Sequence, residues 1–262
     1  MKLTVLGCGT SSGVPMIGCN CEVCRSTDPR NKRRRCSILI EALGQTILVD
    51  TGPDLRMQLL DADVQHIDAL VYTHAHADHV HGIDDLRALN NAMHRSIPTY
   101  GEAAILEHIR SRFAYAFQES RAALGYWRPQ LDPVVFDGPF RIGPVEVRPF
   151  RQRHGRSDSW GLRVGDFAYS TDCDQLDDAA FAALEGVDAW IVDALRDAPH
   201  PSHAHLGRTL EWIERVAPAR AWLTHMNHEV DYETWLTQLP LGVEPAYDGL
   251  VIELAEPAPV QG

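Results

Sequence analysis

Short apolar runs rich in β-branched residues recur along the whole chain, and Gly, Pro, Asp or Asn residues bound each run. Runs of this length and composition are typical of buried β-strands. The pattern therefore predicts strands at Leu3–Gly7, Cys36–Glu41, Thr46–Asp50, Ala69–Thr73, Pro133–Phe136, Val145–Phe150, Gly161–Val164, Phe167–Thr171, Ala189–Ala194, Ala219–Thr224 and Leu250–Leu254.

Helical periodicity separates many of these runs. It predicts helices at Pro53–Leu60, Ile83–Asn91, Ala103–Phe117, Asp177–Leu184, Leu206–Val216 and Tyr232–Gln238. Because helices are interspersed with strands, the pattern favours an α/β sandwich of two sheets with helices on its outer faces, in a single domain of residues 1–262. Polar side chains able to do chemistry repeatedly follow the C-terminal ends of the predicted strands, where loops can form one cleft.

Composition and charge narrow the class of protein. The 262 residues are 45% hydrophobic and 23% charged, which is typical of a globular chain. The net charge of −12 argues against a general polyanion binder, so a nucleic-acid polymer is not expected as a partner. No apolar run approaches the roughly 20 residues that cross a bilayer, so no membrane association and a cytoplasmic location are expected. The basic run Lys32–Arg35 fits a solvated charged segment better than a phosphate-binding patch.

The densest chemical signal follows the predicted strand Ala69–Thr73. It reads His74-Ala75-His76-Ala77-Asp78-His79, with ligand-type side chains at four of six positions. Imidazole nitrogens suit Zn, Mn or Fe, and a carboxylate adds a hard oxygen ligand. Alternate residues in an extended turn can serve two neighbouring sites. The motif therefore predicts a functional metal site with room for two ions, rather than a histidine-rich surface turn.

Three later positions offer further ligands, each directly after an apolar run: His154, Asp172 and His225. Taken singly, each one also fits an ordinary hydrogen-bonded loop residue. A carboxylate can bridge two cations roughly 3.5 to 4 Å apart, which is the spacing of two-metal hydrolytic centres. We therefore predict that Asp172 is the bridge.

A second cluster, Cys19, Cys21 and Cys24, lies in a loop at about residues 18–36. These cysteines are too close in sequence for mutual disulfides, and thiolates prefer zinc. We predict a closed structural zinc site with an unidentified fourth ligand; three free thiols are the alternative. The remaining cysteines are predicted to be buried thiols: Cys8, Cys36 and Cys173.

The order His-x-His-x-Asp-His followed by single His, Asp and His residues resembles the metallo-β-lactamase superfamily, over about Leu3–Leu254. The resemblance implies an αββα sandwich with metals at the edge between its sheets. It places one ion on His74, His76, His154 and Asp172, and the other on Asp78, His79, Asp172 and His225. It also implies that Asp50 braces a metal histidine, although a turn or helix-capping role fits this residue as well.

Within the superfamily, the cysteine cluster, the opening Gly9–Pro15 and the ending Thr224-His225-Met226-Asn227-His228 resemble the phosphoribosyl cyclic phosphate phosphodiesterase (PhnP) branch. This likeness implies that His228 completes the zinc site, although a loop histidine is the alternative by residue type. It also implies a homodimer and a histidine that meets the substrate phosphate before a Leu-led helix. The spacing to Leu206 favours His203 over His205 for that role, and His203 and Asp78 are the expected catalytic residues.

The resemblance implies hydrolysis of a small cyclic phosphate, either a phosphoribosyl cyclic phosphate or a 2′,3′-cyclic nucleotide. Two divalent ions, Mn or Zn, would activate a hydroxide for in-line attack on phosphorus, beside one structural Zn. Three rivals stay open. The first is a thioester, lactone or β-lactam hydrolase with the same ligands, and the second is a tRNA-processing endonuclease. The third is a non-catalytic zinc-bound scaffold similar to PqqB.

Overall fold

The strands near the N-terminus carry apolar side chains on both faces, so both of their faces must be covered. In β2 (Ser37–Ala42), Ile38 and Ile40 pack into one hydrophobic core while Leu39 packs into another. In β3 (Gln45–Val49), Ile47 contributes to the first of these cores. Strands with two apolar faces belong in the middle of a layered structure.

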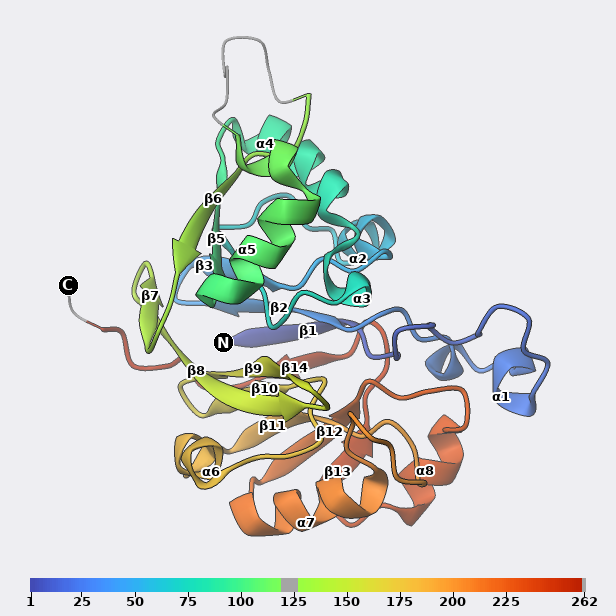
Figure 1. Ribbon diagram of the computed structural model, residues 1–262. Helices are drawn as coiled ribbons and strands as arrows, with labels where there is room; N and C mark the ends of the chain where they lie inside the picture. The colour runs from blue at the N-terminus through green and yellow to red at the C-terminus, as the bar shows by residue number, and fades with distance from the viewer. Residues whose placement is uncertain (119–126, 261–262) are drawn as a thin grey trace.

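The computed structural model describes residues 1–118 and 127–260, so residues 119–126 and 261–262 of the predicted domain lie outside the described part. Two seven-stranded sheets are stacked in its centre (Figure 1). The first sheet has the order β14-β1-β2-β3-β4-β5-β6. Its other strands are β1 (Lys2–Gly7), β4 (Ala69–Val71), β5 (Ile97–Gly101), β6 (Leu131–Val135) and β14 (Val251–Glu253).

The second sheet has the order β13-β12-β11-β10-β9-β8-β7. Both sheets are mixed, with antiparallel pairs at one side and parallel pairs at the other. The strands of the second sheet are β7 (Phe140–Ile142), β8 (Val145–His154), β9 (Ser157–Val164), β10 (Phe167–Ser170), β11 (Ala189–Asp193), β12 (Arg220–Thr224) and β13 (Val243–Pro245).

Helices cover the outer faces of both sheets (Figure 1). On the first sheet lie α2 (Leu55–Asp61), α4 (Leu86–Met93) and α5 (Ala103–Arg112), and on the second lie α6 (Asp178–Leu184), α7 (Leu206–Val216) and α8 (Tyr232–Gln238). Shorter pieces are α1 (Glu22–Arg25), α3 (Ala77–Val80) and the 3₁₀ turns η1 (Pro29–Asn31), η2 (Ile83–Asp85) and η3 (Ala114–Phe117). The predicted αββα sandwich is confirmed.

Every predicted strand and helix is present, α7 and α8 with the predicted ends and the others with shifted ends, but the sequence pattern missed three strands and the short helices α1 and α3. Pro98 interrupts the apolar run of β5, which nevertheless pairs with both β4 and β6. The other two, β7 and β13, are three residues long and lie at sheet edges. Strands this short, or carrying Pro, lack the alternation that identifies a strand in sequence.

Parallel pairing brings several strand ends to the same edge of the sandwich. In the first sheet β3 and β4 are parallel, and in the second β10, β11 and β12 are parallel. The residues that follow these strands therefore gather in one place although they are far apart in the chain. This edge carries the histidines and aspartates singled out from the sequence.

The prediction that the basic run Lys32–Arg35 is solvated was wrong for Arg33, while the other three residues of the run are partly exposed. Arg33 is only 2% exposed, and its guanidinium donates hydrogen bonds to the carbonyl oxygens of Asn227 and Val230 and to Oδ1 of Asn31. Local sequence cannot reveal this burial, because the two carbonyl acceptors lie 194 and 197 residues away in the chain. The predicted burial of the three remaining cysteines is confirmed, since all are fully buried: Cys8, Cys36 and Cys173.

Within residues 1–118 and 127–260, no helix has the length and apolar character needed to span a lipid bilayer.

Candidate metal centre

The histidine-rich motif begins where β4 ends and turns into the short helix α3. Thr73 is held in place by its neighbours, because its carbonyl oxygen accepts a hydrogen bond from the Trp160 amide at 3.0 Å. His76 is the N-cap of α3, which positions Asp78 and His79 within the first turn. The extended residues before the helix and the helical residues after it thus present side chains in two directions.

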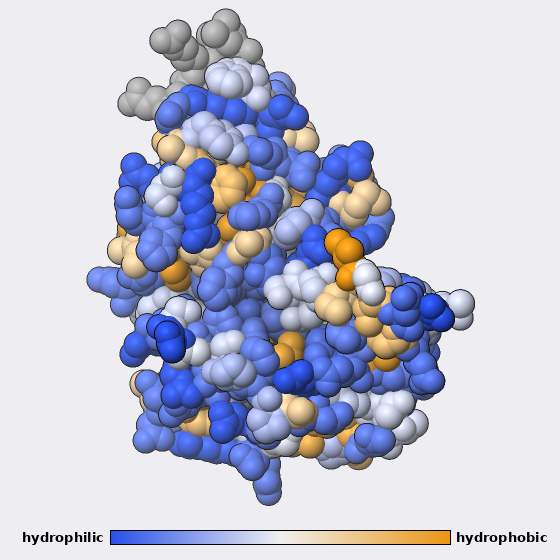
Figure 2. Space-filling view, turned by 45° about the vertical axis from the view of Figure 1, so that its right-hand side comes forward, coloured by the Kyte–Doolittle hydropathy of each residue, from blue (hydrophilic) through white to orange (hydrophobic). Residues whose placement is uncertain are grey.

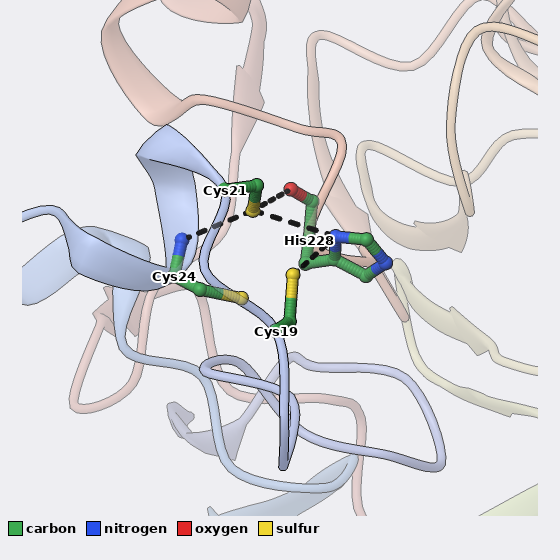
Figure 3. Close-up of side chains that lie close together, drawn as sticks. All are labelled: Cys19, Cys21, Cys24 and His228. Atoms are coloured by element: carbon green, nitrogen blue, oxygen red, sulfur yellow. Dashed lines mark hydrogen bonds between the residues drawn. The ribbon is translucent and has the colours of Figure 1, made fainter.

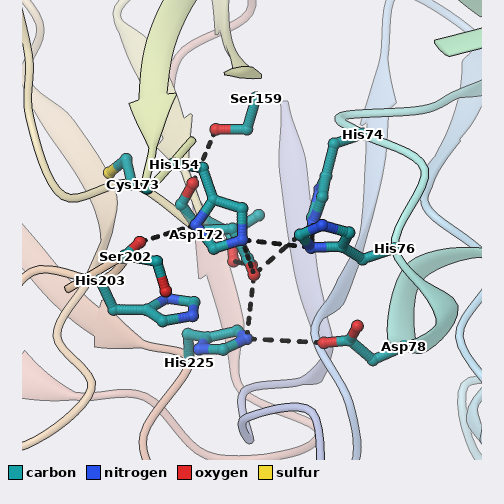
Figure 4. A network of polar contacts seen from close by, with 12 residues as sticks. His74, His76, Asp78, His154, Ser159, Asp172, Cys173, Ser202, His203 and His225 are labelled. Carbon is teal, nitrogen blue, oxygen red and sulfur yellow. Dashed lines mark hydrogen bonds and ion pairs between the residues drawn. The ribbon is translucent and has the colours of Figure 1, made fainter. Parts of the chain in front are cut away.

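One group of ligand atoms comes from His74, His76, His154 and Asp172, all within 4.8 Å of one another (Figure 4). Nδ1 of His76 lies 3.1 Å from Nε2 of His74 and 3.2 Å from Nε2 of His154. Oδ1 of Asp172 lies 3.6 Å from Nε2 of His74 and 3.7 Å from Nε2 of His154. His76 is exposed, whereas the other three residues are buried.

The second group, Asp78, His79, Asp172 and His225, is buried throughout and also lies within 4.8 Å. Oδ2 of Asp172 is 3.1 Å from Nε2 of His79, and its Oδ1 is 3.2 Å from Nε2 of His225. Oδ2 of Asp78 lies 3.4 Å from Nε2 of His79 and 3.7 Å from Nε2 of His225. Asp172 therefore stands between the two groups and belongs to both.

The backbone conformation at the strand ends directs these side chains toward the ligand groups. Asp50, Asp172 and His225 each follow a strand with a positive φ of 63°, 54° and 59°, respectively. Non-glycine residues seldom adopt this left-handed conformation, and it is concentrated at functional sites. Thr171 also donates a hydrogen bond to Oδ2 of Asp172 at 2.6 Å, which fixes the carboxylate.

Asp50 lies fully buried behind the second group. Its carboxylate accepts hydrogen bonds from the amide and hydroxyl of Thr73 at 2.9 and 2.7 Å, and it lies 2.7 Å from Nδ1 of His79. Such a contact orients the imidazole and leaves Nε2 facing the group, as expected of a residue that braces a metal ligand. The helix-capping alternative does not hold, because Asp50 caps no helix among the described residues.

Protonation of the histidines in the first group suits metal binding. Burial, together with the neighbouring imidazoles, holds the pKa of His74 well below its ordinary value, and burial likewise lowers the pKa of His76 and His154. Metal-ligating histidines must be neutral. Burial opposes ionisation of Asp172, but His225, His79 and His74 outweigh it and hold the pKa of Asp172 well below its usual range.

Three buried imidazole nitrogens have no hydrogen-bond partner among the described residues: Nε2 of His79 and both ring nitrogens of His225. Buried polar atoms are rarely left unpaired, because the loss of hydration without compensation is costly. Each Nε2 faces carboxylate oxygens across a short gap, which is a donor set suited to divalent cations. The residues present therefore fit the metals that the resemblance implies.

His203 lies beside the second group. Its ring stacks on that of His225 with centroids 4.4 Å apart, and its Nδ1 is 3.0 Å from Oδ2 of Asp193. Burial disfavours the charged imidazole, but the Asp193 carboxylate outweighs it and raises the pKa of His203 to about 9. His205, by contrast, caps α7 by accepting the amide of Arg208. Of the two candidates, only His203 borders the site.

Sequence reasoning missed Asp193 and Ser202. Asp193 ends β11 and holds His203, while the carbonyl oxygen of Ser202 lies 2.7 Å from Nδ1 of His154 and orients that ring. An acidic residue at the end of a predicted strand is the same signal that identified Asp172, so Asp193 was detectable. The Ser202 contact is made by a backbone carbonyl oxygen, which every residue has, so the sequence gives no sign of it.

The cysteine loop brings Cys19, Cys21, Cys24 and His228 together, with ligand atoms all within 4.8 Å (Figure 3). Nδ1 of His228 lies 3.6 Å from Sγ of Cys19 and 3.5 Å from Sγ of Cys21. The backbone amide of Cys24 donates to Sγ of Cys21, which lowers the pKa of that thiol to about 6 and favours the thiolate that zinc binds. Three thiols and one imidazole match a closed tetrahedral site.

Comparison with known proteins agrees with this geometry. Residues 45–226 match the family model described as a beta-lactamase superfamily domain. The chain is 35% identical to a solved structure described as a new diphosphatase from the PhnP family, with a TM-score of 0.90 and with 98% of this chain and 99% of that chain covered.

Two curated relatives differ from that structure in their described roles. An octanoyltransferase of Porphyromonas gingivalis is 36% identical over 253 residues, which cover 95% of this chain and 51% of that protein. Coenzyme PQQ synthesis protein B of Methylococcus capsulatus is 25% identical over 312 residues, which cover 97% of this chain and 100% of that protein. The chain therefore spans about half the length of the octanoyltransferase.

The family model covers well over half of the chain, and the PhnP-family structure is matched along nearly all of its length. Both matches agree with the ligand order and with the two-sheet architecture, so the resemblance inferred from the motifs is confirmed. The chain belongs to the metallo-β-lactamase superfamily, in the PhnP branch.

Proposed function

We propose that this protein is a phosphodiesterase that hydrolyses a small cyclic phosphate, such as a phosphoribosyl cyclic phosphate or a 2′,3′-cyclic nucleotide. The observation that carries the proposal is the pair of ligand groups that share Asp172, with His203 stacked against one of them. Two-metal centres of this kind suit in-line displacement at phosphorus. The whole-length likeness to a diphosphatase of the PhnP family supports phosphoryl rather than acyl substrates.

The residues of the two groups would hold two divalent ions, Zn or Mn, and the cysteine cluster with His228 one Zn. When bound, the two ions would activate a water molecule and neutralise charge on the transferring phosphoryl group. Asp172 would serve both ligand groups, and Asp50 would hold the ring of His79 in the orientation that points its Nε2 at the second group. Asp78 would serve as a ligand and help to orient the attacking water.

His203 would meet the substrate directly. Asp193 occupies Nδ1 of His203, so Nε2 stays available to donate to a phosphoryl oxygen or to the leaving alkoxide. The stacking of His203 on His225 places that nitrogen at the border of the ligand groups. A small substrate also agrees with the net charge of −12, which disfavours binding to long RNA.

A substrate panel tests the reaction class. The metal-loaded protein is expected to hydrolyse bis(p-nitrophenyl) phosphate and 2′,3′-cyclic AMP, while lactoylglutathione and precursor tRNA stay intact, because the likeness to the PhnP-family diphosphatase and the net charge of −12 favour small phosphodiesters. Release of p-nitrophenol, chromatography of the nucleotide and gel analysis of the RNA provide the readouts. Turnover of the thioester alone, or cleavage of the RNA alone, would show that the proposed reaction is wrong.

Replacing His203 by alanine is expected to lower phosphodiester turnover on the order of 10²-fold, because a positioned proton donor contributes about that much. Metal content, measured by elemental analysis, should not change, since His203 stands outside the two ligand groups that share Asp172. His205→Ala is the matched control: it removes the α7 cap and should cost about 1 kcal/mol of stability while turnover is kept. Loss of metal from His203→Ala would show that His203 is a metal ligand. Loss of turnover only in His205→Ala would show that His205, not His203, meets the substrate.

A further inference from the structure

The loop between β11 and α7, residues 194–205, carries two residues that contact the ligand groups. The carbonyl oxygen of Ser202 orients the ring of His154, and the ring of His203 stacks on that of His225 (Figure 4). A displacement of this β11–α7 loop would therefore disturb a ligand of each group and the expected contact of His203 with the substrate. The contacts that hold the loop thus bear directly on the proposed reaction.

The middle of the loop is exposed. The amide of Leu195 donates to the carbonyl oxygen of Ala204 at 2.9 Å, which joins the two ends, but residues 197–199 between them lie on the surface. The neighbouring ligand groups are open to solvent as well. A cavity of about 600 Å³ reaches them at His74 and His76, and Figure 2 shows a hydrophilic hollow between the upper part of the molecule, which carries α5, and the lower part. Because ordering an exposed loop costs conformational entropy, its middle depends on specific hydrogen bonds.

Arg196, near the start of the loop, supplies these hydrogen bonds. Its Nε donates to the carbonyl oxygen of Ala198 at 3.2 Å, and its Nη2 donates to that of Pro199 at 3.4 Å. Its Nη1 donates to Oε1 of Glu229 at 2.8 Å. All three nitrogens of one planar guanidinium are engaged, which leaves the side chain little freedom. The loop is thereby folded around Arg196 and anchored to Glu229.

Glu229 is itself fixed by Asn227. Its Oε1 also accepts a hydrogen bond from Nδ2 of Asn227 at 3.0 Å, and its amide donates to Oδ1 of Asn227 at 2.8 Å. Asn227 lies between His225 of the second group and His228 of the cysteine cluster. The amide of Asn227 donates to the carbonyl oxygen of Leu195 at 3.0 Å. The segment that carries a ligand of each cluster therefore holds the loop at two points, by its main chain at Leu195 and by its Glu229 side chain at Arg196.

The expected effect of this ion pair is local. The side chains of Arg196 and Glu229 are 28% and 47% exposed, and exposed ion pairs usually contribute little to the free energy of unfolding. Catalysis is more sensitive to position, because a misplacement of about 1 Å can lower a rate about 100-fold. Loss of the pair should therefore change turnover far more than it changes the melting temperature.

We propose that Arg196 and Glu229 are positioning residues for phosphodiester hydrolysis, because their ion pair holds the β11–α7 loop with His203 beside the second group. The inference rests on the proposed phosphodiesterase function and adds two residues to it. Neither residue belongs to a ligand group, and neither takes part in bond cleavage. The pair also links the segment that carries His225 and His228 to the loop that carries the expected proton donor.

Replacing Arg196 by methionine is expected to lower kcat for bis(p-nitrophenyl) phosphate about tenfold in the metal-loaded protein, while KM changes less than about twofold. The substrate still binds, but His203 is misplaced. Glu229→Gln should lower kcat about threefold, because an amide oxygen accepts the same hydrogen bond without the charge. Metal content should stay unchanged in both variants. Amide hydrogen exchange, measured by mass spectrometry, should become faster within residues 197–203 and stay the same elsewhere.

A double-substitution cycle shows whether Arg196 acts through His203. Added to His203→Ala, Arg196→Met should lower kcat by less than about a further twofold, because the group that it positions is already absent. Added to His205→Ala, it should give the full loss of about tenfold. A merely structural role would lower kcat equally in both backgrounds. Glu229→Gln allows the same cycle should Arg196→Met fold poorly.

The matched control is Arg95→Met. Arg95 also donates to a carboxylate and to a backbone carbonyl oxygen, those of Asp68 at 2.8 Å and Ile67 at 3.1 Å. It lies just before β5 begins, whereas the metal-ligand residues follow the C-terminal ends of strands. Its kcat and the hydrogen exchange of residues 197–203 should equal those of the unaltered protein.

Three results would overturn the inference. The first is an unchanged kcat in both Arg196→Met and Glu229→Gln, and the second is an equal loss with and without His203. The third is a loss of active-site metal from Arg196→Met, which would show that the pair supports the ligand His154 rather than His203. Hydrolysis of bis(p-nitrophenyl) phosphate by the unaltered protein separates these results from failure of the proposed function: if that diester and 2′,3′-cyclic AMP both stay intact, both proposals are wrong.

Discussion

Replacing Asp172 by alanine is expected to lower kcat/KM for phosphodiesters by at least about 10³-fold. Loss of a residue that merely orients a ligand typically costs 10- to 100-fold, and a carboxylate shared by two ligand groups should cost more. The oxygens of Asp172 lie between 3.1 and 3.7 Å from four imidazole nitrogens, so its removal takes the common anion from both groups at once.

Metal content is the second readout of the same variant. Elemental analysis of the unaltered protein is expected to find about three ions per chain, and Asp172→Ala should retain about one, held by the cysteine cluster. Asp172→Asn keeps the size of the side chain and should behave similarly if the alanine variant folds poorly. Circular dichroism and the melting temperature report on folding in each case.

The matched control for Asp172 is Asp188→Asn, an exposed carboxylate just before β11. Its turnover and metal content should equal those of the unaltered protein. If both Asp172 variants keep two active-site ions and more than a tenth of the turnover, Asp172 is not shared between two metals.

Replacing Cys21 by serine is expected to remove one zinc ion per chain and to expose the cysteine loop to proteases. The loop has only a small core of its own, made of Val14, Val23 and Cys24, separate from the two main cores. Burial of a few such side chains contributes about 1.5 to 3 kcal/mol each, whereas ordering each backbone residue costs about 1 to 2 kcal/mol. A metal cross-link would therefore add to the few contacts that order the loop.

The same substitution should also affect turnover at the active site, because one segment of the chain carries a ligand of each cluster. His228 lies three residues after His225, and this segment is tied to the N-terminal loop by hydrogen bonds between Met226 and both Cys8 and Thr10. Turnover is therefore expected to fall in Cys21→Ser while the two active-site ions stay bound. Zinc analysis, limited proteolysis and phosphodiester assays measure the three effects.

The control for the cysteine loop is Cys8→Ala, a buried thiol outside the cluster, which should leave metal content unchanged. Unaltered zinc content in both Cys21→Ser and Cys24→Ser would show that these thiols are free. A single ion in the unaltered protein, lost entirely in Cys21→Ser, would instead favour a non-catalytic scaffold and contradict the proposed hydrolytic centre.

The local pattern of apolar residues was sufficient to predict much of the fold. The short apolar runs within β3, β10 and β11 favour strands buried on both faces, and interspersed helices imply layers. The same patterns failed at β5, because Pro98 breaks the run, and at Arg33, because charge in sequence predicts exposure while the fold supplies buried carbonyl acceptors. Both failures have one cause, which is that the compensating partners lie elsewhere in the chain.

For the site, the sequence by itself determined the ligand types and their positions directly after strands, since a strand and the residue that follows it are joined covalently. Only the tertiary structure decided which of those residues meet. His76 and His154 are 78 residues apart, and the stacking of two sheets brings their nitrogens to 3.2 Å. The tertiary structure also showed which of two candidate histidines borders the site: His203 does and is held by Asp193, whereas His205 caps a helix. Such choices depend on sheet register and packing, which involve residues distant in the chain and therefore leave no local pattern.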